Sequence, residues 1–155
     1  MTHHFRQTRR VQFAETDLAG IVHFSNFYRY MEEAEHAFYR SLGYSVHDMP
    51  GDAPGSAVGW PRVHASADFR KPLRFEEEFE VELLIAEIRA KTISYVARFW
   101  KEDGELAATG KMVVVCVSFD SGEKRMRAVP IPAAMREKIA EAPAELLAAP
   151  VSPAS

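Results

Sequence analysis

The sequence contains little cysteine and no long apolar run. Its one cysteine, Cys116, excludes a disulfide bond within the chain and fits a reducing compartment. No apolar segment is long enough to span a bilayer, and no signal-peptide pattern opens the chain. We therefore expect a cytoplasmic protein with no membrane partner. We also expect Cys116 to be a buried structural thiol, because it lies in a valine-rich run.

Sequence patterns for metal binding and for several kinds of catalysis are also missing. His36, His47 and His64 lack ligand-like spacing with cysteine or acidic residues. There is no glycine-rich phosphate loop and no Gly-x-Ser-x-Gly motif. These absences argue against a metal site and a nucleophilic serine. The formal net charge of −3 argues against a general nucleic-acid-binding protein.

The composition fits one globular domain. Of the 155 residues, 47% are hydrophobic and 26% are charged, which is sufficient for a substantial core. We expect a single domain over residues 1–142. The tail over residues 143–155 is rich in alanine and proline, and we expect it to be disordered.

The longest predicted helix covers about residues 25–42 and follows a predicted strand over residues 6–14. Its apolar side chains recur with the helical period of 3.6 residues, which predicts one buried face. Ser25 or Asn26 can cap its start, and Gly43 can end it in the left-handed conformation. The predicted buried face consists of Phe27, Tyr30, Met31, Ala34, Phe38 and Leu42.

The second half of the sequence predicts mainly strands. Residues 44–59 are rich in proline and glycine and predict a long loop. Alternating apolar residues then predict strands over residues 62–70 and 78–86. Residues 92–101 are rich in β-branched and aromatic side chains, and residues 106–119 contain the longest apolar run, so both segments also predict strands. A short strand is expected at 125–129 and a helix from Pro132 to about Glu141. Asp103-Gly104 and residues 120–123 predict turns. A helix and a sheet with one apolar face each must cover one another, which predicts an α+β fold with an antiparallel sheet curled around the helix.

Asp17 lies in a predicted turn shortly before the long helix. A helix start presents unpaired amides and a partial positive charge, which can polarise a carbonyl oxygen. A carboxylate beside it could attack that carbonyl or activate a water molecule. The alternative is that Asp17 only stabilises a turn, as aspartate often does.

The stretch ETDLAGIVHFSNFYRYMEEA resembles the active-site segment of the 4-hydroxybenzoyl-CoA thioesterase family of hotdog-fold enzymes. The family pattern is matched at Glu15, Asp17, Gly20, Val22, Asn26 and Phe27. The resemblance covers roughly residues 6–141, including a Gly-x-Pro at residues 59–61. It implies the hotdog fold, hydrolysis of an acyl-CoA substrate without a further cofactor, and a homodimer or homotetramer with sites at the dimer interface.

The resemblance also implies roles for individual residues. Asp17 matches the catalytic carboxylate, and the backbone N–H of Phe24 matches the donor to the thioester oxygen. Gly20 allows close approach of the backbone. Arg89 and Lys91 match contacts to the CoA phosphates, although such a pair can also be an ordinary solvated turn.

Three positions around the expected acyl group depart from the 4-hydroxybenzoyl enzyme. His23, Trp60 and His64 are substrate-binding candidates whose identities leave the acyl group open, whether aromatic or short-chain. Trp60 could shorten the pocket or stack on an aromatic acyl ring. His23 could contact Asp17 or the substrate, or be a structural histidine in a turn.

Several alternatives remain open at this level. Glu15 could raise the pKa of Asp17 or serve only at the surface. Glu32 or Glu33 is a backup catalytic carboxylate on the helix, although both lie off the apolar stripe. Thioesters of acyl-carrier protein are alternative substrates. A hotdog dehydratase would need His23 or His64 with a carboxylate, and a non-catalytic acyl-CoA binding module is a third possibility.

Overall fold

A computed structural model describes residues 1–119, 125–148 and 150. Strands dominate the fold, with one long helix near the N-terminus. The strands are β1 His4–Arg10, β2 Met49–Pro50, β3 Ala57–Gly59, β4 Arg62–Phe69, β5 Glu78–Ile88, β6 Thr92–Lys101, β7 Leu106–Val115, β8 Val117–Phe119 and β9 Met126–Ala128. The helices are α1 Ser25–Ser41, α2 Ala133–Arg136 and α3 Ala144–Ala148, with a 3₁₀ turn at Phe13–Glu15.

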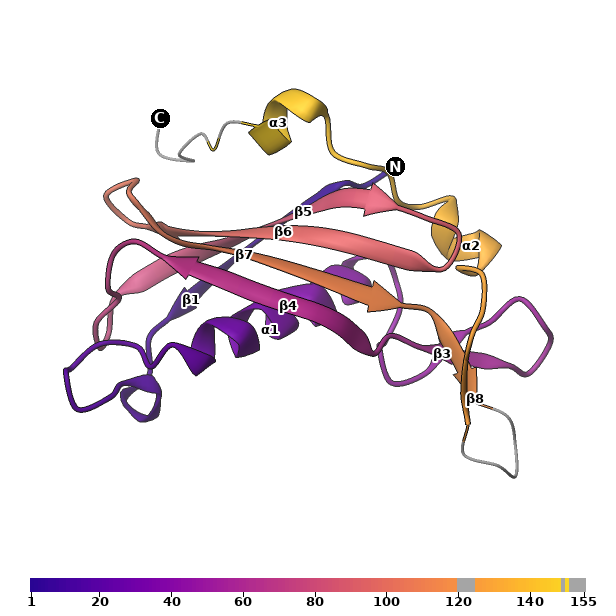
Figure 1. Ribbon diagram of the computed structural model, residues 1–155, viewed down its shortest axis with the longest axis horizontal. Coiled ribbons are helices and arrows are strands. Elements are labelled where there is room, and N and C mark those ends of the chain that lie inside the picture. Colours follow the sequence, from indigo (N-terminus) through magenta and orange to yellow (C-terminus); the bar gives the residue numbers. More distant parts are fainter. Residues whose placement is uncertain (120–124, 149, 151–155) are drawn as a thin grey trace.

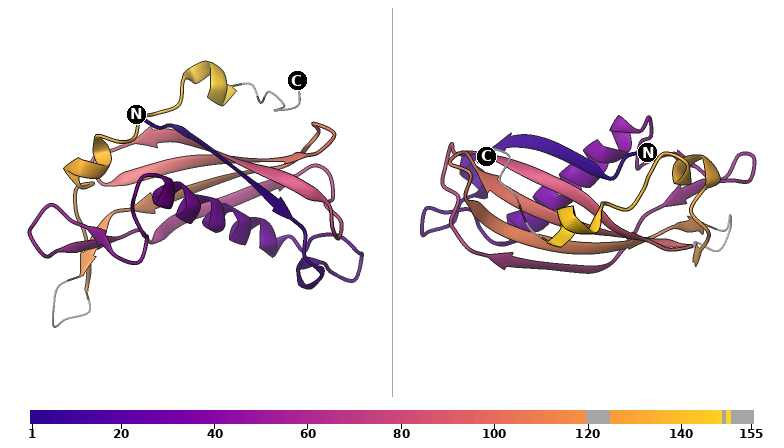
Figure 2. Two further views of the ribbon diagram at one scale, coloured as in Figure 1. Left: turned by 180° about the vertical axis from the view of Figure 1, so that it is seen from behind. Right: turned by 90° about the horizontal axis from the view of Figure 1, so that it is seen from above.

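The main sheet has five antiparallel strands in the order β1-β5-β6-β7-β4. It curves around α1, which lies across its concave face (Figures 1 and 2). The alternating residues of β5 that face α1, among them Phe79, Val81 and Leu83, are all buried in the core. The expected antiparallel sheet around one long helix is therefore present.

The helix α1 has the apolar face that its periodicity predicts. Phe27, Tyr30, Met31, Ala34 and Phe38 are buried, and Leu42 packs against the core. Gly43 follows the helix with φ of +91°, a conformation that favours glycine. No helix of the described residues is long and apolar enough to cross a membrane.

A small second sheet differs from the prediction. The loop expected over residues 44–59 contains β2 and β3, which join β8 and β9 in the order β2-β3-β8-β9. The single strand expected over residues 106–119 breaks at Cys116, whose N–H donates to the Lys91 carbonyl at 2.7 Å and leaves the ladder. Cys116 is buried as expected, and burial raises the pKa of its thiol to about 12. The turn predicted at residues 120–123 lies outside the described residues.

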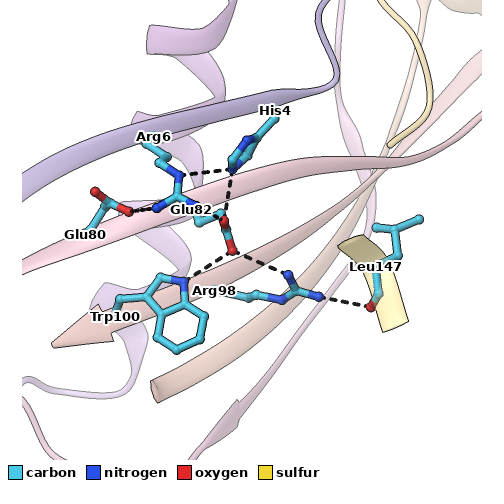
Figure 3. A network of polar contacts seen from close by, with 7 residues as sticks. All are labelled: His4, Arg6, Glu80, Glu82, Arg98, Trp100 and Leu147. Atoms are coloured by element: carbon cyan, nitrogen blue, oxygen red, sulfur yellow. Dashed lines mark hydrogen bonds and ion pairs between the residues drawn. The ribbon is translucent and has the colours of Figure 1, made fainter. Parts of the chain in front are cut away.

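The outer face of the main sheet carries a buried carboxylate under the C-terminal segment (Figure 3). Glu82 of β5 is 1% exposed, although it points away from α1. It accepts hydrogen bonds from His4 Nε2 at 2.9 Å, Arg6 Nη2 at 2.7 Å and Trp100 Nε1 at 3.2 Å. Arg98, which is also buried, contacts Glu82 at 3.4 Å.

The short helix α3 lies on this outer face, opposite α1 (Figure 1). The carbonyl of Leu147 accepts a hydrogen bond from Arg98 Nη2 at 3.0 Å. The segment expected to be disordered from residue 143 therefore includes a short helix, because a buried arginine on the sheet holds it. The helix expected from Pro132 begins as predicted but ends at Arg136 rather than Glu141.

Candidate active site

The segment before α1 is a tight loop centred on Asp17. The Asp17 N–H donates to the Ile21 carbonyl at 2.8 Å, and its carbonyl accepts from the Gly20 N–H at 2.9 Å. The Asp17 Oδ1 accepts from the Ala19 N–H at 2.9 Å. Gly20 has φ of +79°, which explains the glycine at this position. The carboxylate is therefore held by the backbone and remains half-buried.

This loop is fastened to the sheet and to the helix. The Val22 N–H donates to the Leu73 carbonyl at 2.8 Å, and Ile21 pairs with Arg74 across an antiparallel bridge. The Asn26 side chain donates to the Glu15 carbonyl at 2.9 Å. Asn26, expected as a possible helix cap, thus ties the first turn of α1 to the Asp17 loop.

Asp17 lines a cavity of about 460 Å³ between this loop and the segment after β4. Most of its wall is aromatic or aliphatic, and Asp17 is its one carboxylate among the described residues. This is the size and character of a small-molecule site. The wall consists of Asp17, Ile21, Val22, Phe24, Phe27, Phe69, Arg70, Lys71, Pro72 and Leu73.

The start of α1 opens onto the same cavity through Phe24. Phe24 precedes the first residue of the helix and already has helical backbone angles. In the part of the chain that the structure describes, its N–H has no acceptor. A free amide at the positive end of the helix, beside an apolar cavity that holds a carboxylate, can polarise a carbonyl oxygen.

His23 caps the helix instead of facing the cavity wall. Its Nδ1 accepts a hydrogen bond from the Ser25 N–H at 3.3 Å and contacts Ser25 Oγ at 2.7 Å. Because Nδ1 accepts, the proton of the neutral ring lies on Nε2. The prediction that Ser25 or Asn26 caps the helix is wrong, since neither the Ser25 nor the Asn26 side chain supplies that bond.

The other two aromatic candidates lie outside the cavity wall. Trp60 is buried in the core, where its Nε1 donates to Met49 Sδ at 3.1 Å and its ring lies 5.9 Å from Tyr39. His64 is exposed on β4 and contacts Ser66 Oγ at 3.3 Å. Within one chain, the cavity brings together Asp17 and Phe24 but neither Trp60 nor His64.

Arg89 and Lys91 lie in the turn between β5 and β6, at the opposite end of the sheet from Asp17 (Figure 1). β5 has 11 residues and begins beside the Asp17 end. At about 3.3 Å per residue, the two ends of β5 are roughly 35 Å apart. Both side chains are exposed, and Arg89 Nε donates to Glu87 at 2.8 Å. Within one chain, Asp17 is therefore too far from Arg89 and Lys91 for all three to contact the same part of a ligand.

The glutamates that were considered together with Asp17 form ion pairs with arginines. Glu15 binds Arg9 at 2.6 Å and accepts from the Gln12 N–H at 2.8 Å. Glu33 also binds Arg9, at 2.7 Å, and Glu32 binds Arg62 at 2.9 Å. Glu32 and Glu33 are about half exposed, which agrees with their position off the apolar stripe.

The sequence did not reveal that Glu35 is the buried carboxylate of α1. It is 1% exposed, accepts from Arg62 Nη2 at 3.0 Å, and its Oε2 has no partner in the described part of the chain. Burial raises the pKa of this carboxyl to about 7, an effect that Arg62 opposes. Its spacing of four residues from both Met31 and Tyr39 places it on the inward face, a signal that could have identified it.

We expect Glu35→Gln to weaken the pH dependence of stability. The folded protein retains this proton to about pH 7, whereas the ordinary value for the carboxyl is 4.5. Between these values the folded state binds more protons than the unfolded state, so the free energy of unfolding falls as pH rises. The slope is at most about 1.4 kcal/mol per pH unit. Urea unfolding between about pH 5 and pH 8 measures it, and equal slopes for both proteins would contradict the assignment.

Comparison with known proteins places this geometry in a family. The family model of the thioesterase-like superfamily matches residues 11–147. The chain belongs to the thioesterase-like superfamily. A 1,4-dihydroxy-2-naphthoyl-CoA hydrolase of Prochlorococcus marinus is 30% identical over 103 residues, which cover 64% of this chain and 68% of the relative.

Solved structures of superfamily members have the same fold. A 1,4-dihydroxy-2-naphthoyl-CoA thioesterase from Synechocystis is 27% identical, with a TM-score of 0.74 over 86% of this chain and 93% of its own. A gentisyl-coenzyme A thioesterase is 29% identical, with a TM-score of 0.71 over 84% of this chain and 98% of its own. These similarities confirm the expected hotdog fold and the enzyme class, a thioester hydrolase.

Proposed function

We propose that this superfamily member hydrolyses a CoA thioester to a free acid and CoA, with Asp17 as the catalytic carboxylate. The observation that carries the proposal is the position of Asp17 in the cavity wall beside the start of α1. Asp17 and Phe24 line one cavity. If the unpaired Phe24 amide reaches a thioester carbonyl there, that carbonyl meets a nucleophile or base and an oxyanion donor together.

The chemistry requires two contributions from these groups. The Phe24 N–H stabilises the negative charge that develops on the carbonyl oxygen. The Asp17 carboxylate either attacks the carbonyl carbon, releasing the CoA thiolate and leaving an anhydride that water then cleaves, or removes a proton from an attacking water. Gly20 does not line the cavity, and its positive φ supports the turn that holds Asp17.

We further propose that two chains combine to form the complete site. β4 is an edge strand, and its apolar residues Val63 and Phe69 are exposed. Such an edge favours pairing with another strand. A two-fold antiparallel pairing of β4 strands would bring the turn with Arg89 and Lys91 of one chain toward the Asp17 end of the other. The phosphates of CoA could then contact those two cations, and His64 on β4 would lie at the interface.

A hotdog dehydratase has less support in this cavity. No histidine of the described residues lines it, His23 is bonded to Ser25, and His64 is exposed on β4. A dehydratase would need one of these rings beside a carboxylate. Trp60 is held in the core by Met49 and Tyr39, so we propose that it supports the fold near the second sheet.

The experiment that tests the proposed function is a hydrolysis screen over aromatic and short-chain acyl-CoAs with detection of free thiol. We expect turnover of at least one aromatic acyl-CoA, because the cavity presents Phe24, Phe27 and Phe69. The same acyl groups on acyl-carrier protein serve as the comparison. Binding of acyl-CoAs without release of thiol would support a binding module and contradict the proposal.

A further inference from the structure

Two cations share the wall of the cavity with Asp17, and the other seven lining residues are apolar. Arg70 and Lys71 follow β4 directly, and both backbone amides donate to the Ala107 carbonyl, at 2.8 and 3.0 Å. These two hydrogen bonds fix the backbone of residues 70 and 71. The feature to be explained is why a mainly apolar cavity has positive charge in its wall.

Only one of these cations has a carboxylate partner. Lys71 Nζ binds Glu105 at 2.7 Å, whereas Arg70 makes no ion pair within the described residues. Six other arginines of the chain do pair with glutamates: Arg6, Arg9, Arg10, Arg62, Arg89 and Arg98. Arg70 is thus a cavity cation whose donors are available to a ligand.

The CoA phosphates are too far from the thioester to explain Arg70. About thirteen covalent bonds separate the thioester sulfur from the nearest phosphorus, which is roughly 15 Å in an extended arm. A cavity of 460 Å³ equals a sphere only about 10 Å across, and Asp17 lies in the same wall. A substrate with its carbonyl at Asp17 therefore places its acyl group or the adjoining end of its pantetheine arm beside Arg70, and not its phosphates.

The wall is complementary to an aromatic ring that carries an acidic oxygen. Phe27 and Phe69 meet edge to face at 5.1 Å, and Phe24 adds a third ring to the wall. We infer that Arg70 is a specificity-determining residue that binds a hydroxyl or carboxylate oxygen on the ring of an aromatic acyl group. Arg70 is exposed at the mouth of the cavity. Its guanidinium can donate to such an oxygen, and a charge-assisted bond is stronger than one between neutral groups. This inference rests on the proposed function.

Kinetics on a matched set of aryl-CoAs test the inference. The set consists of benzoyl-CoA and the positional isomers of hydroxybenzoyl-CoA and carboxybenzoyl-CoA. We expect Arg70→Ala to lower kcat/KM for the best substituted isomer by about 10- to 100-fold and for benzoyl-CoA by less than about threefold. Arg70→Lys should recover part of the loss, because it retains the charge but not the planar fork.

Two comparison variants separate this role from others. Arg40→Ala removes an exposed arginine at the far end of α1 and should alter no substrate selectively. The double variant Arg89→Ala with Lys91→Ala should weaken all CoA substrates alike, as expected of phosphate contacts. If Arg70→Ala also weakens all of them alike, or if the wild type does not prefer a substituted ring, the inference is wrong. Hydrolysis of aliphatic acyl-CoAs alone would refute the inference and leave the proposed function intact, whereas no hydrolysis of any CoA thioester would refute the proposed function.

Discussion

Replacing Asp17 by Asn is expected to lower kcat for acyl-CoA hydrolysis by about 10²- to 10⁴-fold, the usual contribution of a positioned acid or base. Asparagine has nearly the same shape but neither the negative charge nor the basicity of the carboxylate. Its side-chain oxygen can still accept from the Ala19 N–H, so the loop should keep its conformation. Release of free thiol at saturating acyl-CoA measures the effect.

The matched control is Asp103→Asn. Asp103 Oδ1 also accepts a backbone N–H two residues ahead, that of Glu105 at 2.9 Å, and it lies in a turn outside the Asp17 cavity. This variant should retain wild-type turnover, while both variants should unfold at the same urea concentration as the wild type. Full activity of Asp17→Asn on each substrate that the wild type cleaves would contradict the assignment of Asp17 as the catalytic carboxylate.

The route of hydrolysis can be decided with the same protein. If the carboxylate attacks the thioester directly, a single turnover in water enriched in oxygen-18 labels the Asp17 carboxyl in every molecule whose anhydride water opens at the Asp17 carbonyl, so label in Asp17 identifies this route. If Asp17 only activates water, the label appears solely in the released acid. Mass spectrometry of the peptide that contains Asp17 distinguishes these outcomes.

Local patterns predicted the elements of the fold well because each element has one apolar face. The period of Phe27, Tyr30 and Phe38 identified the buried face of α1. β-Branched and aromatic residues identified β6 at its observed limits, Thr92–Lys101. Strand breaks depend on distant partners and were missed. Cys116 leaves the ladder because its amide bonds to Lys91 in another hairpin, which no local pattern encodes.

The sequence predictions did not include buried charge. Glu35 and Glu82 are each buried against an arginine that is distant in the chain. For the candidate site, the loop around Asp17 could be predicted from its motif. The place of Arg70 in the cavity wall could not, because only folding brings the segment after β4 against residues 21–22.

The largest expected loss of stability follows from Glu82→Ala. This change leaves Arg98, which is 3% exposed, without its carboxylate inside the fold. Removing one partner of a buried ion pair costs about 3–5 kcal/mol. His4 and Trp100 also lose this acceptor, whereas Arg6 keeps its bond to Glu80. Urea unfolding of the variant should show the free energy of unfolding reduced by that amount.

Glu80→Ala is the control that separates the effect of losing a buried carboxylate from the effect of losing a negative charge. Glu80 lies two residues away on the same face of β5, binds the same Arg6 at 2.7 Å, and is partly exposed. An exposed pair contributes about 0–1 kcal/mol, so this variant should be nearly as stable as the wild type. Adding Arg98→Leu to Glu82→Ala should restore part of the loss, because no buried charge then lacks a partner. Equal losses in Glu80→Ala and Glu82→Ala would mean that the enclosed network contributes no more than a surface ion pair.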